Sequence, residues 1–160
     1  MKPLFQNVVV AVSGSEASIG AAKYGIAMAK LYRSRLIAVY VIDTATLKEL
    51  LISKIFVEDE STDYEKSLED NGHRYLNYVE ELAKKKGVDI EKVLRRGAIF
   101  SEIIAAAEEY DADLILLGGF EEKGTHRDVL SRQHREILRS SRCSVLVVKD
   151  KDVDTLYRRL

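Results

Sequence analysis

The sequence predicts an α/β domain built on a doubly wound, open parallel sheet of five strands with helices on both faces, of the Rossmann-like class. Short, unbroken runs of β-branched residues, such as residues 8–12, are typical of strands buried on both faces of a parallel sheet. Between these runs, apolar residues recur at helical spacing. Alternation of strands with helices of this length indicates βαβ units, which are nearly always right-handed.

Each element follows from a local pattern. The first strand, residues 8–12, ends at Ser13–Gly14, and Ser15 is a suitable N-cap for the helix that follows. The long middle helix is expected to begin at a capping box formed by Thr62 and Glu65 and to end at Gly87. The remaining strands are expected at residues 36–42, 90–94, 114–117 and 144–148, and the later helices at 63–86, 102–110 and 128–139.

The domain is expected to span residues 1–150, because a chain of 160 residues fits one domain. Residues 44–61 form a variable connection rich in leucine. We expect this connection to carry a short helix and to cover one face of the sheet, in preference to forming a partner surface. Residues 151–160 form a polar C-terminal tail that we expect to be loosely held.

Composition excludes several classes of function. The apolar fraction of 46% is enough for a core, and the formal net charge of −1 gives no general attraction to nucleic acid or to an anionic membrane. No apolar run approaches the roughly 18 residues of a membrane-spanning helix. An aromatic platform and a basic recognition helix for nucleic acid are also lacking. The single cysteine, Cys143, favours a reducing cytoplasm.

The functional crevice is expected between the loops that follow Val12 and Gly118. In open α/β sheets, ligands bind beyond the carboxyl ends of the strands, where the strand order reverses. The first strand ends at Ser13–Gly14 and the fourth at Gly118–Gly119, and both turns lead toward a helix N-terminus, where free amide groups favour an anion. Residues 123–142 carry a local charge excess of +4. This excess could steer a phosphate, although a solvated helix face is the simpler interpretation.

Four segments together resemble the universal stress protein family. They are similar to its opening strand and turn, its glycine turn into the third helix, its Ala-Asp-Leu-Ile strand, and its closing helix and strand. These segments are residues 8–16, 97–104, 112–118, and 137–139 followed by 143–148. The resemblance covers nearly the whole domain in the correct order. It implies the adenine nucleotide alpha hydrolase-like form of the fold and a homodimer formed through the edge strand 144–148, unless the polar tail covers that edge.

The phosphate motif of the family is altered in this chain. Nucleotide-binding members carry Gly-x-x-Gly, nine further residues, and then Gly followed by Ser or Thr. Aligned without a gap, the motif falls on Gly118, Glu121, Ser131 and Arg132, of which only the first matches. ATP-binding relatives also usually carry an aspartate where this chain has Ser13. We therefore expect the usual ATP-binding mode to be weak or absent.

The resemblance nevertheless defines a candidate nucleotide crevice. Its residues are Ala11, Ser13, Val41, Gly118, Gly119, Ser131 and Arg132. ATP or AMP is the cofactor class to consider, with Lys123, Arg127 and Arg132 holding phosphate in a rearranged way. This alternative, an adenine-nucleotide sensor, stays open beside a nucleotide-independent role.

Other chemistries have weaker support. The turn at Ser13 resembles a damaged adenylating-enzyme loop, Ser-Gly-Gly-x-Asp-Ser, in which Ser15 and Ala17 replace the second glycine and the aspartate. The Gly-x-Ser-x-Gly elbow of a serine hydrolase is absent. His126 and His134 lie near the crevice as possible bases, but are more typical of surface residues.

The remaining reactive side chains form no recognisable cluster. His73 is expected to be structural or solvated, and Cys143 to be an inert buried thiol. We therefore predict no catalytic residue and no metal site. The expected function is that of a non-catalytic, universal-stress-type protein that acts in the cytoplasm through binding or assembly.

Overall fold

Five parallel strands form one open sheet in the computed structural model, which describes residues 4–119, 127–149 and 151–160. The strands are β1 (Asn7–Val12), β2 (Arg35–Asp43), β3 (Ile90–Gly97), β4 (Leu114–Gly118) and β5 (Ser144–Val148). Their order across the sheet is β3-β2-β1-β4-β5, so the order reverses between β1 and β4. The predicted doubly wound parallel sheet is confirmed, and β5 lies at an edge of the described sheet.

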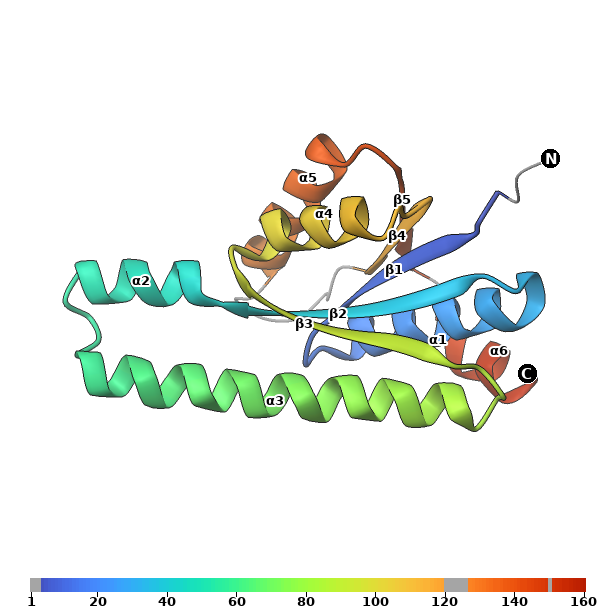
Figure 1. Cartoon of the computed structure of the whole chain (residues 1–160), viewed down its shortest axis with the longest axis horizontal. Coiled ribbons are helices and arrows are strands. Elements are labelled where there is room, and N and C mark those ends of the chain that lie inside the picture. The colour runs from blue at the N-terminus through green and yellow to red at the C-terminus, as the bar shows by residue number, and fades with distance from the viewer. Residues whose placement is uncertain (1–3, 120–126, 150) are drawn as a thin grey trace.

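Helices cover both faces of this sheet (Figure 1). They are α1 (Glu16–Tyr32), α2 (Thr44–Ile52), α3 (Glu58–Lys84), α4 (Ile99–Glu109), α5 (Arg127–Ser140) and α6 (Val153–Arg158). Helices α4 and α5 lie on one face, and α1, α3 and α6 lie on the other. None of the helices in the described residues is long and apolar enough to cross a lipid bilayer.

Alternate residues of each strand supply two separate cores. Val8 and Val10 of β1 pack into the core beneath α1 and α3, whereas Val9 packs into the core beneath α4 and α5. Side chains of a strand point alternately to its two faces, so an unbroken apolar run can fill both cores at once. This is the physical reason that the β-branched runs of the sequence indicate strands.

Helix α3 begins earlier than predicted. It starts at Glu58 after the N-cap Val57, and no side chain caps it. The predicted capping box at Thr62 is wrong, because the Thr62 hydroxyl donates to the Glu58 carbonyl oxygen at 3.0 Å inside the helix. The first turn contains Glu58, Asp59 and Glu60. Their negative charges interact favourably with the positive end of the helix dipole, which supports this earlier start. Gly87 follows the helix with φ +74°, as its predicted role as a terminator requires.

The connection over residues 44–61 does not cover a face of the sheet. It contains the predicted short helix, α2, which Asp43 caps by accepting a hydrogen bond from the Thr46 amide at 3.0 Å. Helix α2 packs against the N-terminal part of α3, and the two form a helical hairpin that projects beyond the end of the sheet (Figure 1). The expectation of a flap is wrong, because α2 extends beyond the strands and packs on α3, with Leu47 buried (Figure 1).

The C-terminal residues are not a loosely held tail. Helix α6 packs on α1, with Val153 buried in the core beneath α1. The Tyr157 hydroxyl donates to the Leu82 carbonyl oxygen at 2.7 Å, and Lys23 pairs with Asp154 at 2.6 Å. The expectation fails because Val153 and Tyr157 on one face of α6, and Leu160 just after the helix, pack against the core from an otherwise polar segment.

Candidate functional site

A mainly apolar cavity of about 220 Å³ lies at the carboxyl ends of β1, β2 and β4. Strand ends and the two helices α4 and α5 supply its apolar lining, which includes Ala11, Val41, Leu117, Ile99, Ile103 and Ile137. The cavity therefore lies where the strand order reverses, in agreement with the general position of ligand sites in open α/β sheets.

Five of the seven predicted crevice residues line this one cavity. They are Ala11, Ser13, Val41, Gly118 and Gly119. Arg132 does not line it and borders a separate surface concavity instead. Ser131 falls within the range of α5, but its side chain lies outside the described part of the chain, as do Glu121, Lys123, His126 and the side chain of Arg127.

Arg132 points elsewhere because of its position on α5. His134 lines the cavity, and successive residues of a helix are about 100° apart, so Arg132 lies about 200° around the helix from it. Ile137, three residues after His134, also faces the cavity and is buried. The apolar side of α5 faces the cavity and so fixes the rotation of this helix about its axis. Arg132 therefore faces away from the crevice.

Three serines at the turn after β1 hydrogen-bond to one another and to the local backbone. The Ser18 hydroxyl accepts from the Ser13 amide at 2.9 Å and donates to the Ser13 carbonyl oxygen at 2.8 Å. The Ser15 hydroxyl accepts from the Ser18 amide at 3.1 Å and lies 3.0 Å from the Ser13 hydroxyl. Ser15 is thus the N-cap of α1, as predicted, and the turn is a cap for the helix.

The two glycines at the end of β4 are required by packing. A Cβ atom at Gly118 would lie 2.6 Å from the backbone carbon and oxygen of Ala17, and one at Gly119 would lie 2.7 Å from the Val148 carbonyl oxygen. Backbone atoms cannot move aside as a flexible side chain can. Close approach of the chain to itself therefore explains both glycines without any contact to phosphate.

The polar side chains of the cavity wall hold neighbouring elements. The Gln133 side-chain oxygen accepts from the Phe100 amide at 3.1 Å and so caps α4 across the cavity. Asp43 caps α2 in the same manner. His134 Nε2 lies 2.6 Å from the Gly118 carbonyl oxygen. The amide groups that would favour an anion at α2 and α4 are therefore partly occupied by side-chain oxygens.

Two of these wall residues, Asp43 and Gln133, are not among the crevice residues predicted from the sequence. Asp43 carried a usable signal, because an aspartate three residues before Thr46 at the end of a strand is a typical N-cap. Gln133 carried none, since its contact with Phe100 joins residues 33 apart in the chain.

The electrostatic character of the cavity suits a neutral group. Within the described residues, no lysine or arginine lines it, and Asp43 is its carboxylate. Burial, with smaller contributions from Tyr75 and Tyr64, raises the pKa of Tyr40 above its ordinary value, so the phenol stays neutral. The described walls thus offer apolar contacts and a few polar groups that already hydrogen-bond to neighbouring elements. They do not offer the set of positive charges that binds several phosphates.

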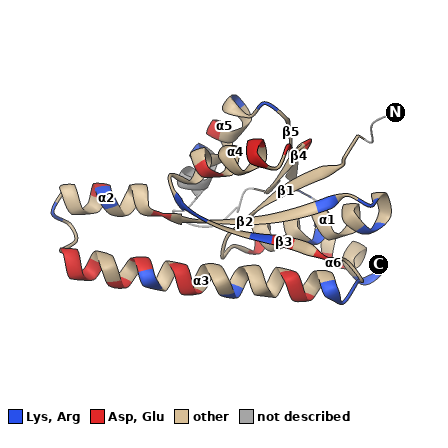
Figure 2. Ribbon diagram, in the orientation of Figure 1, with Lys and Arg blue, Asp and Glu red and all other residues tan. Residues whose placement is uncertain are grey.

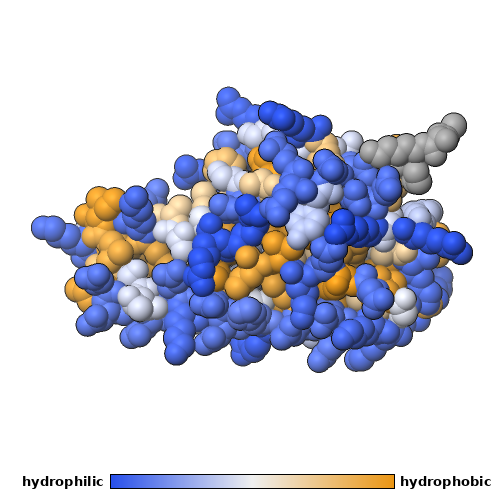
Figure 3. Space-filling view, in the orientation of Figure 1, coloured by the Kyte–Doolittle hydropathy of each residue, from blue (hydrophilic) through white to orange (hydrophobic). Residues whose placement is uncertain are grey.

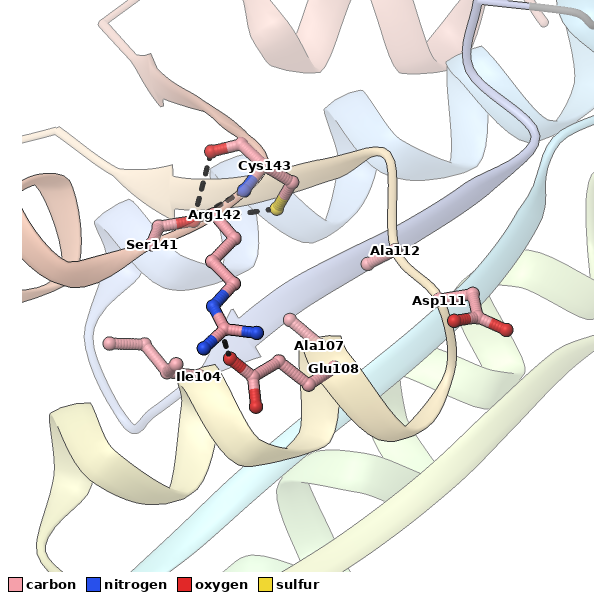
Figure 4. A pocket seen from close by; sticks show the side chains of 8 residues that line it. All are labelled: Ile104, Ala107, Glu108, Asp111, Ala112, Ser141, Arg142 and Cys143. Atoms are coloured by element: carbon pink, nitrogen blue, oxygen red, sulfur yellow. Dashed lines mark hydrogen bonds and ion pairs between the residues drawn. The ribbon is translucent and has the colours of Figure 1, made fainter.

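The thiol of Cys143 lies in a different pocket, between α4 and the start of β5 (Figure 4). Cys143 is half-buried, in contrast to the expected buried position, and its sulfur lies 3.4 Å from the Ser141 hydroxyl. Arg142 reaches across this pocket to Glu108 at 3.5 Å. His73 is exposed on α3, 4.0 Å from Glu69. The described residues contain no group of three or more potential metal ligands.

Comparison with known proteins places this chain in one family. The model of the universal stress protein family matches residues 4–149. A universal stress protein of Methanocaldococcus jannaschii is 30% identical over 153 residues, which cover 91% of this chain and 83% of the relative.

Two solved structures show the same fold. A universal stress protein in complex with cAMP is 23% identical, with a TM-score of 0.62 and coverage of 90% of this chain and 96% of that one. The universal stress protein of Archaeoglobus fulgidus in complex with dAMP is 18% identical, with a TM-score of 0.62 and coverage of 91% and 99%. The family model spans nearly the whole chain, and the fold agrees with it: the chain belongs to the universal stress protein family.

Proposed function

We propose that this chain is a non-catalytic universal stress protein that acts through binding at the cavity between β1 and β4, without the phosphate grip of nucleotide-binding members. One observation carries this proposal. The cavity that gathers Ala11, Val41 and Gly118 is apolar, and its described lining includes no cation. A polyphosphate requires positive charge or free amide groups at close range. The single cysteine of the chain is in keeping with a role in a reducing cytoplasm.

The size of the cavity supports a small, flat ligand group. Pockets that enclose a whole drug-sized ligand usually have volumes of about 300–1,000 Å³. A volume of about 220 Å³ suits one ring system, such as a heterocyclic base, better than a complete nucleoside triphosphate. The apolar strand ends at Ala11, Val41 and Leu117 offer the flat, dry walls that such a ring requires.

A second candidate is an adenine-nucleotide sensor with a rearranged phosphate site. Solved structures of the same fold are complexes with cAMP and dAMP, and both ligands carry one phosphate rather than three. The cavity of this chain lies at the topological switch point and can accept the base. In this mode the single phosphate would lie outside the apolar part of the cavity.

Ligand extraction followed by titration separates the two candidates. The protein is purified gently and extracted with acid, and the extract is analysed by mass spectrometry. The proposal predicts no stoichiometric nucleotide, and calorimetry then shows ATP with magnesium binding no more tightly than adenosine. AMP or ATP in stoichiometric amounts, or at least about tenfold tighter binding of AMP than of adenosine, would overturn the proposal and support the sensor.

A matched pair of variants tests the location. Ala11→Leu fills the cavity from β1 and should abolish the binding of any base that titrates into the wild-type protein. Ala105→Leu adds the same side chain on α4 at a position that does not line the cavity, so binding should persist. Equal loss in both variants would contradict a site in this cavity.

A further inference from the structure

The end of the helical hairpin presents an unpartnered apolar surface. We call residues 51–64, from the end of α2 through the first turns of α3, the hairpin tip. Of the ten large hydrophobic side chains that are exposed in the described residues, five belong to this tip, with exposed fractions of 36% to 73%. These five are Leu51, Ile52, Ile55, Val57 and Tyr64. Figure 3 shows the corresponding apolar surface at the projecting end of the molecule. Such clustering is typical of an interaction surface.

Carboxylates that form no ion pair within the described residues lie on one side of this apolar surface, at the start of α3. Farther along α3, Glu65 and Glu69 form ion pairs with Arg96 at 2.7 and 2.8 Å. The acidic residues before them are exposed, and no ion pair engages them within the described residues. These residues are Glu58, Asp59, Glu60 and Asp63. Figure 2 shows this acidic start of α3 beneath α2. The hairpin tip is therefore a projecting apolar knob with an acidic side.

A surface of opposite charge lies on α5 of the same chain. Three arginines and Glu136 border a concavity of about 400 Å³ there, and we call this surface the α5 basic face. The arginines are Arg132, Arg135 and Arg139. Leu138, on the same helix, has an exposed fraction of 49%. The α5 basic face is thus positively charged and exposed, with an exposed apolar side chain beside it.

We propose that the hairpin tip of one copy of this chain docks on the α5 basic face of a second copy. The acidic residues of the projecting tip match the arginines of the α5 basic face in charge, and the exposed Leu138 beside them offers an apolar contact. The hairpin lies beyond the end of the sheet, whereas α5 covers one face of it (Figure 1). The two surfaces therefore meet between copies of the chain and not within one copy.

This contact is heterologous, because different surfaces of the two copies meet. Each added copy leaves one tip and one basic face free, so the assembly grows until it closes into a ring. The contact differs from a homodimer through the β5 edge, which would leave both surfaces free. It is also independent of the cavity, so the proposed function and this assembly succeed or fail separately.

Charge reversal on each surface provides the test. The tip variant carries Glu58→Lys, Asp59→Lys and Glu60→Lys, and the face variant carries Arg135→Glu and Arg139→Glu. Sedimentation velocity over a range of protein concentrations should show wild-type assemblies larger than those of either variant. We expect self-association of each variant to weaken at least about tenfold, and that of the wild type to weaken with added salt.

Mixing the variants gives the decisive result. The tip variant keeps a normal basic face, and the face variant keeps a normal tip. The reversed tip and the reversed face also match each other in charge, so an equimolar mixture should assemble where neither variant does so alone. A control variant, Asp70→Lys with Glu81→Lys, changes exposed acidic residues of α3 outside the tip and should assemble like the wild type. Circular dichroism confirms that each variant is folded.

Two results would overturn the proposal. In the first, the wild type shows no association beyond that of the two charge-reversed variants. In the second, the mixture sediments as the sum of its separate components, which is the behaviour expected if the β5 edge alone associates.

Discussion

The Nε2 atom of His134 lies 2.6 Å from the carbonyl oxygen of Gly118, so a side chain of α5 is bonded to the last residue of β4. A carbonyl oxygen only accepts hydrogen bonds, and Nε2 therefore carries the hydrogen. This bond closes one wall of the cavity, because His134 and Gly118 both line it.

Replacement of His134 by alanine should lower the free energy of unfolding by about 1 kcal/mol, the usual net value of one hydrogen bond. Urea denaturation measures this change. His73→Ala is the matched control: His73 is exposed on α3, and its replacement should change the stability by less than about 0.5 kcal/mol. Equal effects of the two substitutions would show that the bond to Gly118 contributes nothing.

Alanine at two glycines should change stability in opposite directions. Gly118→Ala forces a Cβ atom to within 2.6 Å of the Ala17 backbone and should cost about 1–3 kcal/mol. Gly20→Ala adds a Cβ atom that meets nothing within 4 Å in the second turn of α1, and should stabilise the protein by about 0.5–1 kcal/mol. Thermal unfolding of both variants checks the signs. A neutral Gly118→Ala variant would contradict the crowding at the end of β4.

The attachment of α6 should depend on one hydroxyl group. Tyr157→Phe removes the donor to the Leu82 carbonyl oxygen and should lower the free energy of unfolding by about 1 kcal/mol. Amide exchange should accelerate in α6 and at the end of α3, where the two partners lie. Tyr32→Phe, which removes an exposed hydroxyl, should leave both measurements unchanged. Unaltered exchange in the Tyr157→Phe variant would mean that packing alone holds α6.

The ion pair between Lys23 and Asp154 should appear in an NMR titration. The hydrogen bond from Lys23, and then its charge, hold the pKa of the Asp154 carboxyl below its ordinary value. The folded-state pKa is thus lower than the unfolded-state value of about 3.9, so the pair stabilises the fold fully above that pH. The contribution is lost as the pH falls through the folded-state pKa.

The carboxyl resonance of Asp154 should accordingly titrate below about 3.9, and the substitution Lys23→Met should return its midpoint toward that value. A midpoint that is the same in both proteins would show that the ion pair does not form in solution.

The layered fold could be predicted because a short run of consecutive apolar residues is enough to identify a strand that is buried on both faces. Val8, Val9 and Val10 fill two cores from three consecutive positions, and few other structures bury such a run. The start of α3 at Glu58 could not be found in the same way, because α2 packs against a segment whose own sequence is polar. Helix α6 was missed for a related reason, since α1 supplies the surface on which it packs.

The position of the cavity could be predicted from topology, but its walls could not. The carboxyl ends of β1 and β4 place Ser13 and Gly118 beside one another whatever their side chains are. The wall formed by Gln133 and His134 depends on the rotation of α5, which long-range packing decides. Arg132 was misplaced on this account, because an ungapped motif alignment carries no information on helix rotation.

Gly118 and Gly119 are confined by neighbouring backbone, and this has a consequence for the interpretation of genomes. Selection for folding alone is enough to retain both glycines in a descendant that has abandoned its ancestral ligand. A glycine at the end of β4 is therefore a signature of the architecture and not of the bound molecule. The presence of this glycine is therefore not, by itself, evidence that a chain of this fold binds ATP.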